Sequence, residues 1–158
     1  MTTKTGIGQD SHAFEETPGK PLILGGIKLD HPIGLKGNSD ADVVLHSISN
    51  AISSITGSNI LGSIADQLYQ EGVTDSSNYL MLALDDLGDW KISHIAISIE
   101  CLKPKISPEI DTMKKSIAKL CHINKTDVGI TATTGEGLTA FGKGEGIQAI
   151  TIITVNKS

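Results

Sequence analysis

The stretch IQAITIITV, residues 147–155, is apolar at nearly every position, and it sets the arrangement expected for the rest of the chain. A strand with one face in water alternates polar and apolar residues, whereas a nearly continuous apolar run predicts burial on both faces. Three further segments have strand patterns, at residues 4–14, 91–101 and 127–134. A single layer of helices covers only one face of a sheet, so we expect a second subunit to cover the other.

Helices are predicted from apolar stripes and start signals. Three segments have both, namely residues 38–56 with Ser39 as N-cap, 75–88 with Asp75 as N-cap, and 107–123 with Ser107 as cap and Pro108 in the first turn. Residues 20–30 have the pattern of a short hairpin that turns at Gly25–Gly26. We therefore expect an α+β fold in one domain, residues 1–158, with a four-stranded antiparallel or mixed sheet covered on one face by helices.

Charge, hydropathy and cysteine content argue against several classes of function. The chain has 158 residues and a net charge of −5, which argues against a nucleic-acid surface because phosphate backbones require clustered Lys and Arg. No apolar run approaches the roughly 18 residues needed to span a membrane, so a cytoplasmic protein is expected. The two cysteines, Cys101 and Cys121, lie among apolar neighbours and are expected to be buried thiols rather than a disulfide or a metal site.

The stretch GIGQDSHAF, residues 6–14, places Asp10 and His12 two residues apart at the end of the first strand. Side chains at i and i+2 project from the same face of a strand, and one acid with one imidazole suits zinc. His46, in the first helix, is the candidate third ligand. Two interpretations remain open for it: a residue at the helix rim bonded to Asp42 one turn earlier, or a ligand oriented by that carboxylate. Three ligands would leave a fourth position open, as in catalytic zinc sites.

The glycine-rich segment TTGEGLTAFGKGEG, residues 133–146, resembles a phosphate-binding P-loop only superficially. Residue 144 is Gly where the magnesium-binding hydroxyl would stand, and the segment leads into a strand rather than a helix. Thr133, Thr134 and Glu136 instead place two hydroxyls and a carboxylate at a strand end. Hydroxyls and turn amides can hold phosphate oxygens, and a carboxylate can hold a bridging magnesium ion.

Taken together, the motifs D-x-H, S-D-x-D-x-x-x-H and T-T-x-E resemble the 2-C-methyl-D-erythritol 2,4-cyclodiphosphate synthase family. The matching segments are GIGQDSHAF, LILGG, GLKGNSDADVVLHSISNAI, CLKPKISP, ITATTGEGL and GKGEGI, in the family's order and spacing. The resemblance covers nearly the whole chain. It implies cyclisation of 4-diphosphocytidyl-2-C-methyl-D-erythritol 2-phosphate with release of CMP, a step of the non-mevalonate route to isoprenoid precursors. It also implies a homotrimer with sheets packed around a threefold axis and active sites between subunits.

The same resemblance assigns roles to individual residues. Asp10, His12 and His46 match the zinc ligands, and Glu136 matches the ligand of a magnesium or manganese ion at the diphosphate. Thr134 matches a transition-state stabiliser, a role that Asn38 shares. The residues that match substrate contacts are Asp10, His12, Asn38, Ser39, Asn59, Gly62, Asp66, Pro104, Lys105, Thr133, Thr134, Gly135, Glu136, Phe141 and Lys143. Pro104 and Lys105 lie in the loop whose backbone reads cytosine in the family.

The chain departs from the family pattern at several of these positions. Asn38 stands where a His is usual, and it keeps a hydrogen-bond donor without a positive charge. NILG, residues 59–62, is shifted by one residue against the usual Asp-Ile-Gly, so that Asp66 fits the later acid. Lys143 replaces a frequent Arg and loses its bidentate geometry. Phe141 lies one residue past the usual aromatic; both residues match positions that line the cavity on the trimer axis.

Two other functions are compatible with the metal ligands alone. A zinc-dependent phosphohydrolase would let water take the open position, and it would release a phosphate monoester rather than a cyclic product. A non-catalytic trimer with structural zinc would bind metal without turnover, although structural sites usually have a fourth protein ligand.

Overall fold

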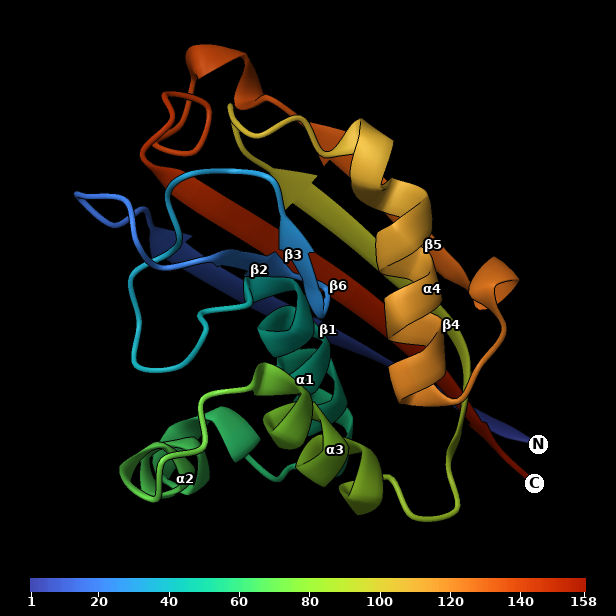
Figure 1. The fold of residues 1–158 in the computed structure, drawn as a ribbon. Coiled ribbons are helices and arrows are strands. Elements are labelled where there is room, and N and C mark those ends of the chain that lie inside the picture. Colours follow the sequence, from blue (N-terminus) through green and yellow to red (C-terminus); the bar gives the residue numbers. More distant parts are fainter.

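The sheet is the centre of the structure, a computed structural model that describes residues 1–158. Its four strands are β1 (Thr2–Ala13), β4 (Lys91–Glu100), β5 (Val128–Thr133) and β6 (Gly146–Lys157), in the order β1-β6-β4-β5 (Figure 1). β6 pairs antiparallel with both β1 and β4, and β4 pairs parallel with β5. The predicted four-stranded mixed sheet is confirmed, with the apolar stretch that begins at residue 147 in a central strand.

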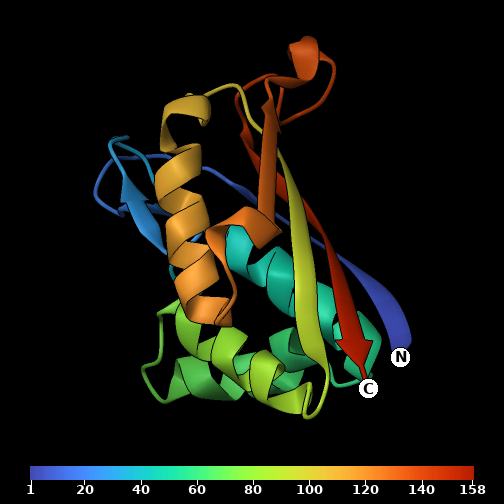
Figure 2. The same ribbon diagram turned by 90° about the vertical axis from the view of Figure 1, so that its right-hand side faces the viewer.

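The three predicted helices are present and lie on one face of the sheet. They are α1 (Val43–Thr56), α3 (Ser76–Asp86) and α4 (Ile110–Cys121). Figure 2 shows α3 and α4 on one side of the strands and no helix on the other side. No helix has the length and apolar character that a membrane crossing requires. Cys101 and Cys121 are buried free thiols, as expected, and burial raises their pKa values to about 11 and about 12.

Shorter elements complete the chain. The predicted hairpin consists of β2 (Leu22–Leu24) and β3 (Ile27–Leu29), which pair around Gly25–Gly26 with both glycines at positive φ. Two elements were not predicted from sequence, namely a π turn, Ile60–Ile64, that is kinked at Leu61 and Gly62, whose backbone angles are not helical, and α2 (Ala65–Gln70). Single 3₁₀ turns lie at Ser107–Glu109, Lys125–Asp127 and Gly135–Gly137. Ser107 therefore begins a 3₁₀ turn before α4 and makes no side-chain cap hydrogen bond, contrary to the prediction.

β1 and α1 pack with their backbones in close contact. A Cβ atom at Gly6 would lie 2.3 Å from the Ala51 carbonyl oxygen, and one at Gly8 would lie 2.1 Å from the Ser47 carbonyl oxygen. No side chain fits at these distances, so glycine at both positions is a condition of this packing. The Asn50 side-chain amide stabilises this helix–strand contact by donating to the Gln9 carbonyl at 3.0 Å.

Asp42, not Ser39, is the N-cap of α1. Its carboxylate accepts the backbone N–H groups of Val44 and Leu45, and also those of Gly25 and Gly26 in the β2–β3 turn, at 2.8–3.1 Å. One fully buried carboxylate thus joins the helix start to the hairpin. Burial raises the pKa of Asp42 to about 6, although the backbone donors favour the ionised form. Ser39 accepts the N–H of Ala41 in the loop before the helix.

In the single chain, β6 is buried only on the face that the helices cover, and its opposite face is uncovered. Ile147, Ala149, Ile153 and Val155 are buried against the helices. On the opposite face Ile152 is 44% exposed, and Ile7 of the neighbouring β1 is 62% exposed. Exposed isoleucines on adjacent strands form an apolar surface of the kind that pairs with another protein surface.

Because Asp42 caps α1 and also binds the β2–β3 turn, we expect its removal to lower the free energy of unfolding more than removal of an ordinary helix N-cap. Asp42→Ala leaves the N–H groups of two elements without their acceptor, so it should lower the free energy of unfolding by about 2–5 kcal/mol. The matched change Asp75→Ala removes an exposed cap that accepts only Ser77 N–H at its helix, and it should cost about 1 kcal/mol. Urea unfolding followed by circular dichroism measures both; equal losses would contradict the role assigned to Asp42.

Candidate functional site

Asp10, His12 and His46 come together at one end of the sheet. Oδ2 of Asp10 lies 3.0 Å from Nδ1 of His46 and 3.3 Å from Nε2 of His12. One ligand atom from each of the three residues can be chosen so that all lie within 4.8 Å of one another, and no other group of three or more potential ligands does so. The predicted grouping of these three side chains is confirmed.

The strand alternation and the glycine contact explain why the triad forms. Gly6, Gly8, Asp10 and His12 occupy alternate positions on the helix-covered face of β1. α1 rests on the two glycines, and its first turns extend along the strand until His46 reaches Asp10. The side chains lie at a partly open edge, since those of Asp10 and His12 are 21% and 29% exposed, and that of His46 is 10% exposed.

The ionisation of Asp10 follows from two opposing effects. Burial alone would raise the pKa of this carboxyl. Hydrogen bonds and charge interactions with His12 and His46 outweigh burial, so its pKa lies below the usual value. An ionised carboxylate beside two imidazole nitrogens is an N,N,O donor set that suits a tetrahedral divalent metal ion and leaves a fourth position for another ligand.

The surroundings of His46 differ from both sequence interpretations. Asp42 is one turn away, but its carboxylate accepts only backbone N–H groups and makes no hydrogen bond to the His46 ring. His46 is buried rather than at a rim, and its Nε2 lies 2.7 Å from Oγ of Ser76, the first residue of α3. Ser76 in turn donates to Asp40. The contact of Ser76 with His46 was not predicted from sequence, because no spacing rule relates residues that lie in different helices.

A cavity of about 490 Å³ opens beside the triad. Besides Asp10 and His12, four residues assigned to the substrate by resemblance line it, namely Asn38, Ser39, Asn59 and Asp66. Gly62 lies next to Asn59, because a Cβ at Gly62 would approach Asn59 Nδ2 to 2.9 Å. Asn50, one turn after His46 on the polar side of the first helix, lines the cavity as well. The lining residues not predicted from sequence are Gly37, Leu61, Ala65, Tyr69 and Tyr79. The placement of Asn59 and Asp66 depends on α2 and the π turn, both missed from sequence.

The Thr-Thr-x-Glu segment lies at the same end of the sheet but near the opposite edge. Asp10 and His12 end β1, and Thr133 ends β5, with β6 and β4 between the two strands. Three strand spacings correspond to about 14 Å. The segment is exposed, and Thr133 and Thr134 accept the N–H groups of Gly135 and Glu136 through their hydroxyls. Glu136 has a φ of 54°, an uncommon conformation for this residue type and one often found at functional positions.

The other predicted residues divide between the two edges. Pro104 and Lys105 follow β4 and lie near the Thr-Thr-x-Glu segment, since Cys101 N–H donates to the Thr133 carbonyl and Cys101 Sγ to the Pro104 carbonyl. Phe141 contributes instead to a small cavity of about 140 Å³ that also includes His12. Lys143 is exposed in the same loop. The chain therefore brings together Asn38, Ser39, Asn59 and Asp66 with the Asp10–His12–His46 group, but not Thr133, Thr134, Gly135, Glu136, Pro104 or Lys105.

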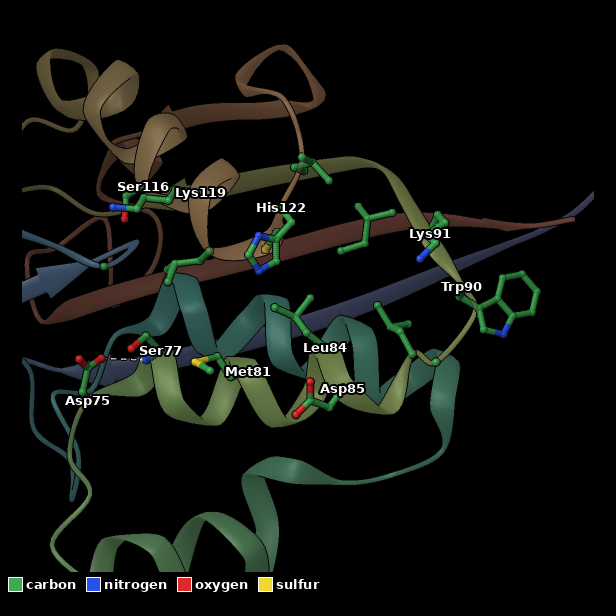
Figure 3. A pocket seen from close by; sticks show the side chains of 17 residues that line it. Asp75, Ser77, Met81, Leu84, Asp85, Trp90, Lys91, Ser116, Lys119 and His122 are labelled. Carbon is green, nitrogen blue, oxygen red and sulfur yellow. Dashed lines mark hydrogen bonds between the residues drawn. The ribbon is translucent and has the colours of Figure 1, made fainter.

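The largest cavity lies elsewhere. It measures about 1080 Å³ and runs between α3 and α4, with Met81, Leu84 and Asp85 on one side and Lys119 and His122 on the other (Figure 3). It contains no cluster of potential metal ligands. Chemistry rather than size therefore identifies the smaller cavity as the candidate site.

Comparison with known proteins agrees with this assignment. The sequence matches the YgbB family over residues 3–156. A relative from Chlamydia trachomatis serovar L2b, named 2-C-methyl-D-erythritol 2,4-cyclodiphosphate synthase, is 48% identical over 156 residues, or 96% of this chain and 87% of the relative. A relative of the same name from Chlamydia felis is 48% identical over 155 residues, or 96% of this chain and 88% of the relative.

Solved structures share the fold. The bifunctional IspDF from Campylobacter jejuni superposes with a TM-score of 0.90 at 28% identity; the match covers 99% of this chain and 43% of that one, so this chain spans less than half of the bifunctional protein. A 2C-methyl-D-erythritol-2,4-cyclodiphosphate synthase in its CDP-bound form superposes with a TM-score of 0.84 at 26% identity, over 97% of this chain and 100% of the other. With its triad, cavity and fold in place, the chain belongs to the YgbB family, that of the 2-C-methyl-D-erythritol 2,4-cyclodiphosphate synthases.

Proposed function

We propose that the protein converts 4-diphosphocytidyl-2-C-methyl-D-erythritol 2-phosphate to 2-C-methyl-D-erythritol 2,4-cyclodiphosphate and CMP. The observation that carries the proposal is the Asp10–His12–His46 group at the mouth of a polar cavity, in a chain 48% identical to relatives named for this reaction. Residues 1–158 act as a single catalytic domain, and the cytoplasm is its expected location.

The reaction is an intramolecular phosphoryl transfer. An oxygen of the 2-phosphate attacks the β-phosphorus of the diphosphate, the bond from that phosphorus to the oxygen of CMP breaks, and CMP leaves. No protein nucleophile is needed, so catalysis rests on holding the two phosphates in line and neutralising their charge. The CDP-bound synthase among the structural neighbours supports a ligand of this chemistry.

The triad fits a zinc ion because its atoms are close enough to share one cation and its donors are two nitrogens and one oxygen. A bound zinc ion would supply Lewis-acid polarisation of a phosphate oxygen and charge neutralisation. Glu136, exposed at the opposite edge, would hold a magnesium or manganese ion at the diphosphate.

The remaining residues bind and orient the substrate. Asn38 donates its amide to a phosphate oxygen, and Thr134 donates its hydroxyl to the charge that develops during transfer. Thr133 and Gly135 contact the diphosphate. Ser39, Asn59, Gly62 and Asp66 face the methylerythritol hydroxyls. Backbone groups around Pro104 and Lys105 distinguish cytosine from uracil by contacting the exocyclic amine, which only cytosine has.

We further propose that the active enzyme is a homotrimer in which the site is completed by a neighbouring subunit. Two observations support this. The metal ligands and Glu136 lie near opposite edges of one sheet, too far apart to contact one diphosphate within a chain. The uncovered sheet face carries the exposed isoleucines Ile7 and Ile152, which packing around a threefold axis would bury. Phe141 and Lys143 would then lie near that axis.

Turnover can be tested directly. We expect the purified protein, incubated with the proposed substrate, zinc and magnesium, to give the paired phosphorus NMR resonances of a cyclic diphosphate together with CMP. A phosphate monoester in place of the cyclic product would identify a phosphohydrolase. Retention of metal without any product would identify a binding protein.

Metal binding is tested separately by thermal unfolding. A ligand that binds only the folded state at 100 times its Kd adds about 2.7 kcal/mol, which corresponds to a rise in Tm of about 5–10 °C for a chain of this size. Zinc chloride should produce this rise in the wild type and not in His46→Ala. The matched control is His122→Asn, which changes an exposed histidine with a φ of 55° to a residue that tolerates this conformation. Loss of the zinc effect in the control would contradict a site at the triad.

Sharing of the site between subunits predicts complementation. His46→Ala and Glu136→Ala should each abolish activity. When the two variants are unfolded together and refolded as mixed trimers, a random mixture should regain about a quarter of wild-type activity, because one site in four combines two intact halves. No recovery from mixed trimers that form normally, as judged by native mass spectrometry, would place the whole site within one chain.

A further inference from the structure

The side of His46 that faces away from Asp10 contacts the buried Ser76, which in turn contacts the half-buried Asp40. Nε2 of His46 lies 2.7 Å from Oγ of Ser76, and that hydroxyl contacts a carboxylate oxygen of Asp40. We infer that Ser76, whose hydroxyl is oriented by Asp40, is a positioning residue. It fixes which ring nitrogen of His46 carries hydrogen and how the ring is oriented, so that Nδ1 would face a bound metal ion. The inference rests on the proposed metal site.

The direction of the hydrogen bonds follows from their donors and acceptors. A carboxylate only accepts, and that of Asp40 faces three donors: the Ser76 hydroxyl, the Ser76 N–H at 3.1 Å and the Asp42 N–H at 3.1 Å. The single hydroxyl hydrogen of Ser76 therefore points to Asp40. Its oxygen is left to accept, and the group that donates to it is the Nε2–H of His46.

This arrangement leaves Nδ1 as the nitrogen with the free lone pair. Nδ1 lies 3.0 Å from Oδ2 of Asp10, which is itself an acceptor. A cation between these two atoms, either a proton on Nδ1 or a metal ion, makes the contact attractive. Ser76 and Asp40 thus prepare Nδ1 to share a cation with Asp10, and the neighbouring His12 makes a divalent metal ion the fitting one.

Burial makes Ser76 hard to replace. Ser76 is fully buried and His46 is 8% exposed, so water has little access to take over the contact. Ser76 is the first residue of α3, and Asp75 caps that helix by accepting the N–H of Ser77. The position of a metal ligand on α1 therefore depends on how α3 docks beside it. Sequence motifs of the site do not include this residue.

The test compares zinc affinity in three variants. Ser76→Ala removes the acceptor, Ser76→Thr keeps a hydroxyl, and Ser49→Ala is the matched control. Ser49 is also a fully buried serine, but its hydroxyl donates only to the Leu45 carbonyl within α1. Zinc is titrated in competition with a chromogenic chelator. We expect the Kd to rise about 10- to 100-fold in Ser76→Ala and to stay near the wild-type value in Ser76→Thr and Ser49→Ala.

A spectroscopic measurement separates positioning from a general loss of structure. Long-range proton–nitrogen NMR of the zinc-loaded protein reports which imidazole nitrogen carries hydrogen. His46 should show a single Nε2–H form in the wild type and in Ser76→Thr, and a changed Nε2 shift in Ser76→Ala. Should Ser76→Ala fail to fold, Asp40→Asn gives the same test, because it weakens the acceptor that orients the Ser76 hydroxyl.

The outcomes distinguish the inference from the function on which it rests. A wild-type protein that binds no zinc would overturn both. Zinc binding by the wild type with the same Kd in Ser76→Ala would overturn the inference alone, as would an equal loss of affinity in Ser49→Ala.

Discussion

The direct contact between the backbones of α1 and β1 is the constraint on which the rest of the site depends. It exists because Gly6 and Gly8 present no side chains to the helix, whose carbonyl groups lie where Cβ atoms would stand. The two residues that follow on the same face, Asp10 and His12, then meet His46 from the helix. A larger residue at either glycine would push the helix outward and separate an imidazole from its carboxylate partner, so this packing also governs the metal site.

A second constraint is the strand order. Because β6 and β4 separate β1 from β5, the metal ligands and the Thr-Thr-x-Glu segment share one end of the sheet without sharing an edge. An active site that needs both groups must draw them from two chains. The uncovered sheet face, with Ile7 and Ile152 exposed, provides a surface for such an assembly. Oligomerisation and catalysis are therefore linked in the proposed enzyme through the topology of one sheet.

Two carboxylates, one fully buried and one half-buried, connect elements that are distant in sequence. Asp42 joins the start of α1 to the β2–β3 turn, and Asp40 joins the segment before α1 to the first residue of α3. Both acids lie near the start of the predicted helical segment 38–56, where negative charge is favourable. The sequence pattern did not reveal that the Asp42 carboxylate is fully occupied by backbone donors, so the interpretation in which this carboxylate bonds to the His46 ring is wrong. Helix spacing relates residues on one helix, whereas a carboxylate bonds to whichever donors the fold brings near it.

The sequence by itself determined the four strands, the three long helices, the hairpin at Gly25–Gly26 and the grouping of Asp10 with His12. These features depend on local periodicity and turn chemistry, which a chain carries in its own order of residues. Only the tertiary structure decided which residue supports His46, how α2 and the π turn bring Asn59 and Asp66 to the cavity, and that Glu136 lies across the sheet from the metal ligands. Those relations depend on how elements pack and in which order strands pair, and residues far apart in sequence carry no local signal of either.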